Sequence, residues 1–363
     1  MMRRAKIVTL LLVALAALAQ GRTITVGPGG VYDFNSIQAA IDDSNDGDTI
    51  IVADGIYTGP GNRDIEFSHG LPEGQTRAIT VRSANGPQNC IIDCNGTESD
   101  RHRGFRFASG EDANSVINGF TIINGYAQWE AVSPPPLPVS REVGGAIYCG
   151  WYSSPTIINC IISGNTSGDV GGGIAGFLSN PTMTNCTFTG NSATDRGGGF
   201  WGSGIVKNCV FWGNSDRWGT NESAQIYNTT VVVVNYSCIQ GLTGALGGIG
   251  NIGDDPCFVD PCNGDYHLKS QAGRWDTNEG RWTNDDRTSP CIDAGDPYSP
   301  IGNEPFPNGG RVNMGAYGGT AEASKSYFGE PVCETIVAGD INGDCKVNFL
   351  DFRLVASHWL EER

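Results

Sequence analysis

Three carboxylates stand at the same place in a repeated stretch of the chain. Glu142, Asp169 and Asp195 each lie two residues before a pair of glycines. If each copy of the repeat forms one coil of a stack, their side chains lie about 5 Å apart. Carboxylates at that spacing attract a cation or raise one another's pKa. Arg196 and Arg217 follow nearby, so we predict these five residues as the catalytic or ligand-binding set, with a solvent-facing turn as the alternative.

A second group of oxygen-bearing side chains lies near the C-terminus. Residues 340–351 read DINGDCKVNFLD, which spaces the oxygens as in a Ca²⁺-binding loop. Position six of the loop is Cys345, where such loops usually have glycine. The predicted Ca²⁺ ligands are the side chains of Asp340, Asn342, Asp344, Asn348 and Asp351 and the carbonyl of Lys346.

The repeat indicates which elements must hold these residues. Residues 158–174, 184–200 and 207–215 read INCIISGNTSGDVGGGI, TNCTFTGNSATDRGGGF and KNCVFWGNS. Apolar residues alternate around each Asn-Cys pair, as in a strand with one buried face and a bend at the asparagine. Gly-Asn turns and glycine clusters follow, so one unit of about 25 residues has the size of one coil of a solenoid.

Stacked coils would bring equal positions together. The cysteines are then expected to form a ladder of buried thiols, and the asparagines beside them to satisfy the bends through stacked amides. The ladder comprises Cys160, Cys186 and Cys209, with Cys238 as a further candidate, and the asparagines are Asn159, Asn185 and Asn208.

Two segments depart from the repeat. Residues 33–59 predict a short helix with Ile37, Ala40 and Ile41 on one face, which would cover the open end of the core. The proline-rich insertion at residues 128–142 predicts a loop that leaves the coils.

Composition sets the class of protein. The chain has 363 residues, 52 of them glycine, and only 17% charged residues, which argues against a helical bundle. Residues 1–19 have the basic start, short apolar run and small-residue end of a cleaved secretory signal. The net charge of −16 excludes nucleic acid and anionic membranes as partners. Export permits disulfides, and the candidate local pairs are Cys257 with Cys262 and Cys333 with Cys345. The four histidines occur singly along the chain.

The opening GDTIIVADGIYTG and the NCxxxGN coils resemble the right-handed parallel β-helix proteins of the pectate-lyase-like superfamily. Residues 253–319, with GDDPCFVDP, GDYHLKS, SPCIDAGDP and RVNMGAYGG, resemble the C-terminal region of secreted β-helix proteins of the choice-of-anchor Q type. This resemblance implies an all-β, right-handed parallel β-helix. Its superfamily includes lyases, glycoside hydrolases and proteins without known chemistry, so function rests on the site.

The Ca²⁺ loop resembles one half of a type I dockerin, a module that docks onto cohesin domains, although dockerins have two copies. We therefore predict a signal at 1–19, a β-helix at 20–320, a linker at 321–332 and a dockerin-like Ca²⁺ module at 333–363. The expected function is binding, with or without degradation by a lyase or hydrolase reaction, of an extracellular polysaccharide. A non-catalytic surface or adhesive protein is the alternative. The protein is expected to be secreted and monomeric, with a cohesin-like or cell-surface anchor as a further partner.

Overall fold

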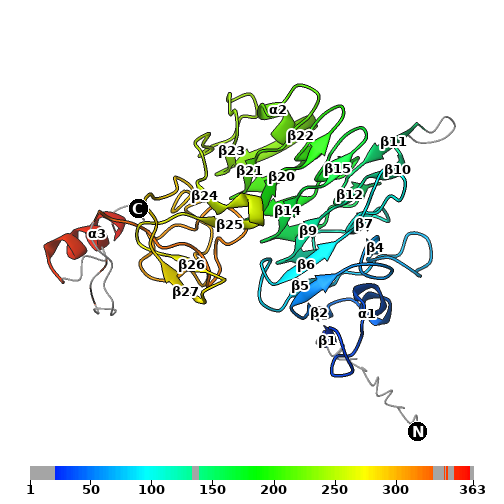
Figure 1. Ribbon diagram of the computed structural model, residues 1–363, viewed down its shortest axis with the longest axis horizontal. Helices are drawn as coiled ribbons and strands as arrows, with labels where there is room; N and C mark the ends of the chain where they lie inside the picture. Colours follow the sequence, from blue (N-terminus) through cyan, green and yellow to red (C-terminus); the bar gives the residue numbers. More distant parts are fainter. Residues whose placement is uncertain (1–20, 133–138, 330–338, 340, 342–346, 360–363) are drawn as a thin grey trace, which may run out of the picture.

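Short strands stack in parallel through the length of the molecule. The computed structural model describes residues 21–132, 139–329, 339, 341 and 347–359. Strands of successive coils pair in register and form three stacks, so the predicted all-β parallel β-helix is confirmed (Figure 1). The long strand β20 (Phe200–Lys207) belongs to two stacks and joins them into one sheet.

The strands of each stack follow in chain order. The first stack contains β1 (Thr23–Val26), β2 (Thr49–Val52), β5 (Thr80–Ser83), β8 (Val116–Asn118), β13 (Thr156–Ile158), β17 (Thr182–Thr184), β20 and β22 (Ile226–Asn235). The second contains β4 (Ile65–Glu66), β7 (Phe105–Phe107), β12 (Ile147–Gly150), β16 (Ile174–Phe177) and β20. The third contains β3 (Gly55–Tyr57), β6 (Cys90–Asp93), β9 (Thr121–Ile123), β14 (Ile161–Ser163), β18 (Thr187–Thr189), β21 (Val210–Trp212) and β23 (Cys238–Ile239). The pair β15 (Thr166–Ser167) and β19 (Ser192–Ala193) lies at a further side of two coils.

The alternating apolar residues fill the inside of the coils. Ile157, Met183 and Val206 are register neighbours in the first stack, and all three are fully buried. In the third stack the rings of Phe188 and Phe211 lie parallel with centroids 4.2 Å apart. Burial of one apolar row per strand therefore holds each coil against the next.

The cysteine ladder is inside the core for three rungs. Cys160, Cys186 and Cys209 are fully buried, and the Cys186 amide donates to Cys209 Sγ at 3.4 Å. The fourth candidate does not continue it, because Cys238 pairs in register with Val210 while the Ser237 hydroxyl accepts from the Cys209 amide. Cys238 is thus one residue out of register with Cys209. Because successive side chains of a strand point to opposite faces, Cys238 lies outside the coil interior, in the cluster below the C-terminal segment.

Stacked amides occur at two sets of asparagines, one of them predicted. Asn159, Asn185 and Asn208 do make the bends, with left-handed φ of 49°, 50° and 56°. Asn208 Nδ2 donates to Asn185 Oδ1 at 3.3 Å, as predicted. These side chains also bind the C-terminal segment, as when Asn159 Nδ2 donates to the carbonyls of Ala316 and Gly318 at 2.9 and 2.8 Å. A longer row of stacked amides, which was not predicted, belongs to the Gly-Asn turns of the same coils and comprises Asn165, Asn191 and Asn214.

Both ends of the coils are covered. Helix α1 (Ile37–Asp43) buries Ile37, Ala40 and Ile41, as predicted, and packs against β1, β2 and β4. At the other end, α2 (Glu222–Gln225) begins after Asn221, whose side chain accepts from the Ala224 amide at 3.1 Å. In the described part of the chain no helix has the length and apolarity that crossing a membrane requires.

The insertion does not simply loop out. It forms the antiparallel hairpin of β10 (Gln128–Ala131) and β11 (Ser140–Val143), while its residues 133–138 lie outside the described part. Val132 and Val143 pack with Tyr148, Val170 and Ala175 in a small apolar cluster. The hairpin therefore covers the outer face of the second stack.

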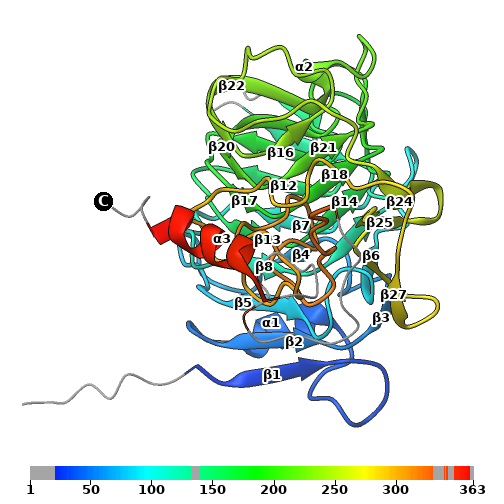
Figure 2. The ribbon, with the colours of Figure 1, turned by 90° about the vertical axis from the view of Figure 1, so that its left-hand side faces the viewer.

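Residues 253–329, here called the C-terminal segment, run back over the third stack (Figure 2). They contain β24 (Phe258–Asp260), the short helix η1 (Pro261–Asn263), β25 (Asp265–Leu268), β26 (Arg274–Asp276) and β27 (Arg281–Thr283). Tyr266, Ala316 and Tyr317 pack on Ile161 of β14, and Leu268 and Met314 pack near Val210 of β21.

The segment also includes part of the predicted linker. Ala323, Ser324 and Ser326 are buried, and the Ser324 hydroxyl donates to the Leu268 carbonyl at 2.6 Å. Helix α3 (Phe349–Trp359) follows beyond residues 330–338, which lie outside the described part. The ten cysteines of the described residues, including Cys257 and Cys262, are free thiols. The proposed partners Cys333 and Cys345 lie outside those residues.

Candidate functional site

Glu142, Asp169 and Asp195 form one column, here called the acidic column. The residues that follow them, Val143, Val170 and Arg196, are bridged in parallel from coil to coil. The Asp195 amide donates to the Asp169 carbonyl at 2.8 Å, and the Val170 amide donates to the Glu142 carbonyl at 3.2 Å. The spacing of successive coils therefore sets the spacing of the three carboxylates, at about 5 Å.

Arginines lie along the whole column. Arg196 Nε and Arg217 Nη1 lie 4.0 and 3.3 Å from Asp195 Oδ1, so both arginines of the predicted set are at the site. Two more arginines were not predicted. Arg101 Nη1 lies 2.6 Å from Glu142 Oε1, and Arg141 Nε lies 2.7 Å from Asp169 Oδ2.

Arg141 links two coils of the column, because its Nη2 also lies 3.7 Å from Asp195 Oδ2. Neither Arg101 nor Arg141 was in the predicted set of site residues. Arg101 is far from Glu142 along the chain, and Arg141 belongs to the insertion, where the repeat gives no register.

Aromatic rings flank the arginines. The Arg196 guanidinium lies over the rings of Tyr227 and Trp218, at 4.6 and 5.2 Å from their centroids, and Arg217 lies 4.7 Å from that of Trp218. At the other end, Arg101 lies over Tyr126 and Trp129. The side chains of Trp129 and Trp218 are 61% and 50% exposed, so ring surface remains open to a ligand.

Two other tryptophans near the column are covered. Trp201 packs against the apolar cluster under the hairpin, and Trp212 packs against the cluster below the C-terminal segment. Trp212 does point away from the coil interior, as the alternation predicts, but the C-terminal segment covers it. Trp129 and Trp218 are the tryptophans of this face with exposed rings among the described residues.

The hairpin that carries Glu142 is fixed by a buried ion-pair cluster. Arg103 is fully buried, and its Nη1 lies 3.1 Å from Glu130 Oε1, which is also 2.9 Å from Arg106 Nε. Glu130 is the cross-strand partner of Arg141. Loss of one member of the cluster would leave a buried charge without its partner, which is costly, so the cluster keeps Glu130 in place. Because Glu130 is opposite Arg141, the cluster also fixes the position of Arg141 and its neighbour Glu142 at the column.

The electrostatics of the column differ along its length. Burial raises the pKa of Asp169, and the neighbouring carboxylates Asp195 and Glu142 raise it too, while Arg141 lowers it. The net effect is a pKa above the ordinary value. Beside the column, Arg196 Nε and Asp216 Oδ2 are buried without a hydrogen-bond partner among the described residues. The site therefore combines a carboxyl that holds its proton more strongly with polar atoms that a ligand or water can satisfy.

The predicted Ca²⁺ loop is described in part. Asp340, Asn342, Asp344 and Lys346 lie outside the described residues, whereas Asn348 and Asp351 lie within them. The buried Asp351 carboxylate accepts from the amides of Ile341 and Asn348, each at 2.7 Å. It thus ties the start of the loop to α3, and its oxygens are the hard donors that Ca²⁺ prefers. Among the described residues no group of three or more His, Cys, Asp or Glu side chains is arranged to hold a metal.

One family model matches the chain. It is described as disaggregatase related and matches residues 198–295, about a quarter of the sequence, from β20 into the C-terminal segment. The match fits a β-helix, as do the parallel stacks. No curated protein matches the chain.

Proposed function

We propose that the chain binds an extracellular polysaccharide along the face that carries the acidic column. The observation that carries the proposal is the alignment of ring faces, guanidinium groups and carboxylates over successive coils. A solenoid presents equal groups at equal intervals, which suits a linear polymer of repeating units. The match to the disaggregatase-related family and the β-helix fold support a polysaccharide-related role.

The groups of this face match the chemistry of sugars. Exposed rings such as Trp129 and Trp218 offer apolar surface to the C–H faces of sugar rings. The guanidinium groups of Arg141 and Arg217 can donate hydrogen bonds to hydroxyl or carboxylate oxygens, and the Asp195 carboxylate can accept hydrogen bonds from hydroxyls. The face is thus built to contact hydroxyls and ring faces together.

Cleavage of the bound glycan is the second candidate function. A glycoside hydrolase needs one carboxyl that keeps its proton and a second carboxylate nearby. Asp169, with its raised pKa, fits the general acid, and Asp195 on the next coil fits the second group. Arginines 141 and 217 touch these carboxylates, which favours binding over catalysis and keeps a non-catalytic surface protein as the alternative.

The test is retention of the full chain on plant, algal and bacterial polysaccharides in affinity gels. Trp218→Ala and Arg141→Ala should weaken retention about tenfold, a loss of about 1.4 kcal/mol in binding free energy. Tyr298→Ala is the matched control, because Tyr298 is 92% exposed and lies away from the column. Equal retention of all variants would show that the ligand face lies elsewhere.

Product analysis separates binding from cleavage. New reducing ends that disappear in Asp169→Asn would indicate a hydrolase, and unsaturated ends a lyase. Retention without products would identify a binding protein.

The C-terminal loop supplies a Ca²⁺ site and an attachment point in this proposal. Asn348 and Asp351, together with Asp340, Asn342, Asp344 and the Lys346 carbonyl, would hold the ion. The predicted signal at 1–19 would bring the protein outside the cell, where Ca²⁺ and glycans are both present. A cohesin-like or cell-surface partner would then bind the dockerin-like module.

A further inference from the structure

A groove separates the outer face of the first stack from the C-terminal segment. It is a cavity of about 470 Å³ lined by residues 82–87, from the end of β5 into the turn that follows, by Asn118 at the end of β8, and by Asn303 and residues 319–322 of the segment. Asn159 fixes the two walls together through its hydrogen bonds to Ala316 and Gly318. The groove and the acidic column lie at different corners of the coil. Asn159, beside the groove, is at the bend between β13 and β14, whereas Asp169 is at the later bend after β15.

The coil wall carries a cation without a carboxylate partner. Arg82 and Asn118 are register partners on the neighbouring strands β5 and β8. Arg82 Nη1 donates to the Ser83 carbonyl at 3.1 Å, but within the described residues no carboxylate lies in ion-pair range of its guanidinium. The side-chain amide of Asn118 likewise has no hydrogen-bond partner among the described residues. Both side chains are half-buried, so their unused donors face the groove that they line.

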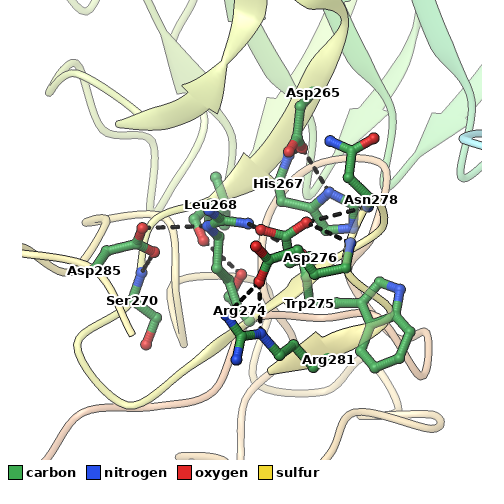
Figure 3. A network of polar contacts seen from close by, with 12 residues as sticks. Asp265, His267, Leu268, Ser270, Arg274, Trp275, Asp276, Asn278, Arg281 and Asp285 are labelled. Atoms are coloured by element: carbon green, nitrogen blue, oxygen red, sulfur yellow. Dashed lines mark hydrogen bonds and ion pairs between the residues drawn. The ribbon is translucent and has the colours of Figure 1, made fainter. Parts of the chain in front are cut away.

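The opposite wall carries one carboxylate, Glu322, that lies beside a buried histidine. Glu322 Oε2 lies 3.6 Å from Nε2 of His267, which is fully buried, and His267 Nδ1 lies 2.7 Å from Asp265 Oδ1. Figure 3 shows the Asp265 carboxylate beside the His267 ring, and Tyr317 stacks on that ring with centroids 3.7 Å apart. Burial opposes the charged form, yet Asp265 and Glu322 raise the pKa of His267 above its ordinary value.

The strand that bears His267 is well anchored. In the same view, the Arg274 guanidinium lies between Asp285 and Asp276, with N–O distances of 3.2 and 3.4 Å. Asp285 also accepts from the amide of Ser270, just after β25, at 2.9 Å, so it links Arg274 of β26 to the end of β25.

We propose that this groove is a second binding site, for a single saccharide unit that carries an anionic group. Arg82 pairs with the anion, the side-chain amides of Asn118 and Asn303 bind ring hydroxyls, and the Glu322 carboxylate accepts a hydrogen bond from a hydroxyl. The anion is either a uronate carboxylate or a sulfate ester, since both present oxygens that a guanidinium binds. The site goes beyond the proposed function, because its residues are separate from the acidic column.

The probes are glucuronic acid, glucose 6-sulfate and glucose, each titrated into the full chain and followed by saturation-transfer NMR. We expect one of the two anionic sugars to bind with a Kd below about 10 mM, and glucose to bind at least about tenfold more weakly. Which anionic sugar binds identifies the anion. Arg82→Gln should weaken that binding about tenfold, and the exposed Asn303→Ala should weaken it even if Arg82→Gln fails to fold.

Two controls separate this site from the acidic column. Arg281→Gln changes an exposed arginine of the same segment and should leave binding unchanged. The double variant Asp169→Asn with Asp195→Asn, which removes two carboxylates of the acidic column, should also leave this binding unchanged. The proposal is overturned if neither anionic sugar binds up to about 10 mM. Equal binding by folded Arg82→Gln and Asn303→Ala overturns it as well.

Discussion

The amide ladder of the Gly-Asn turns should be one of the strongest single contributions to stability. Asn191 is fully buried, and its Nδ2 donates to the Ile162 carbonyl and to Asn214 Oδ1, both at 2.8 Å. Its Oδ1 accepts from the amide and the Nδ2 of Asn165, at 3.1 and 2.9 Å. Asn191→Ala removes four hydrogen bonds of about 1 kcal/mol each, and some partners keep other bonds, so we expect a loss of about 2–4 kcal/mol.

Urea unfolding followed by circular dichroism measures this loss. The slope of the unfolding free energy against urea concentration should be the same for the variant and the unaltered protein. The matched control is Asn180→Ala, since Asn180 is exposed and its side chain is outside the ladder, and it should change stability by less than about 0.5 kcal/mol. The double variant Asn191→Ala with Asn214→Ala should lose less than the sum of the single losses, because the two amides share a bond. An Asn191→Ala variant as stable as Asn180→Ala would refute the reasoning.

Three further predictions concern the core, the C-terminal segment and the Ca²⁺ loop. Cys186→Ala should lower the free energy of unfolding by about 1–3 kcal/mol and leave glycan retention unchanged; a folded variant that no longer binds would give the thiol a functional role. Burial raises the pKa of Glu304 to about 7 from 4.5. The protonated form is therefore favoured in the fold, and the contribution of Glu304 to stability should be fully present below about pH 4.5 and be lost as the pH rises through about 7. Glu304→Gln should remove this fall, as measured by urea unfolding at pH 5 and 8, and a slope that persists would contradict the assignment. Addition of Ca²⁺ should raise the unfolding temperature of the full chain but not that of Asp351→Ala, and calorimetry without Ca²⁺ binding at millimolar concentration would rule out the loop.

The interior of the coils could be predicted from the sequence because each coil repeats the same local rule. Alternation around Ile157, Met183 and Val206 fixed which residues face inward, and the copies fixed which of them stack. The same reasoning placed Glu142, Asp169 and Asp195 in one column, because a position that repeats before each glycine pair must stack whatever its function.

Contacts between distant segments could not be predicted in this way. The sequence does not show that Asn159, Asn185 and Asn208 face the C-terminal segment, so their hydrogen bonds to that segment were not predicted. His267 occurs singly in the sequence, and its partner Glu322 is 55 residues away, so only the folded chain shows the pair. Arg141 was missed for the same reason, because the hairpin of the insertion sets its position.

The last amide of the ladder also decides how the molecule meets its neighbours. Gln225 Oε1 accepts from Asn214 Nδ2 at 2.8 Å, and its own Nε2 turns back to the carbonyls of Asn214 and Thr220, at 2.9 and 3.1 Å. A row of asparagines alone would end in an unused donor and acceptor, which is what another solenoid end needs to join it. Because both groups of the fully buried Gln225 are used within its own chain, the row of amides ends inside the molecule. The end of the solenoid therefore presents no free amide of this row to another molecule.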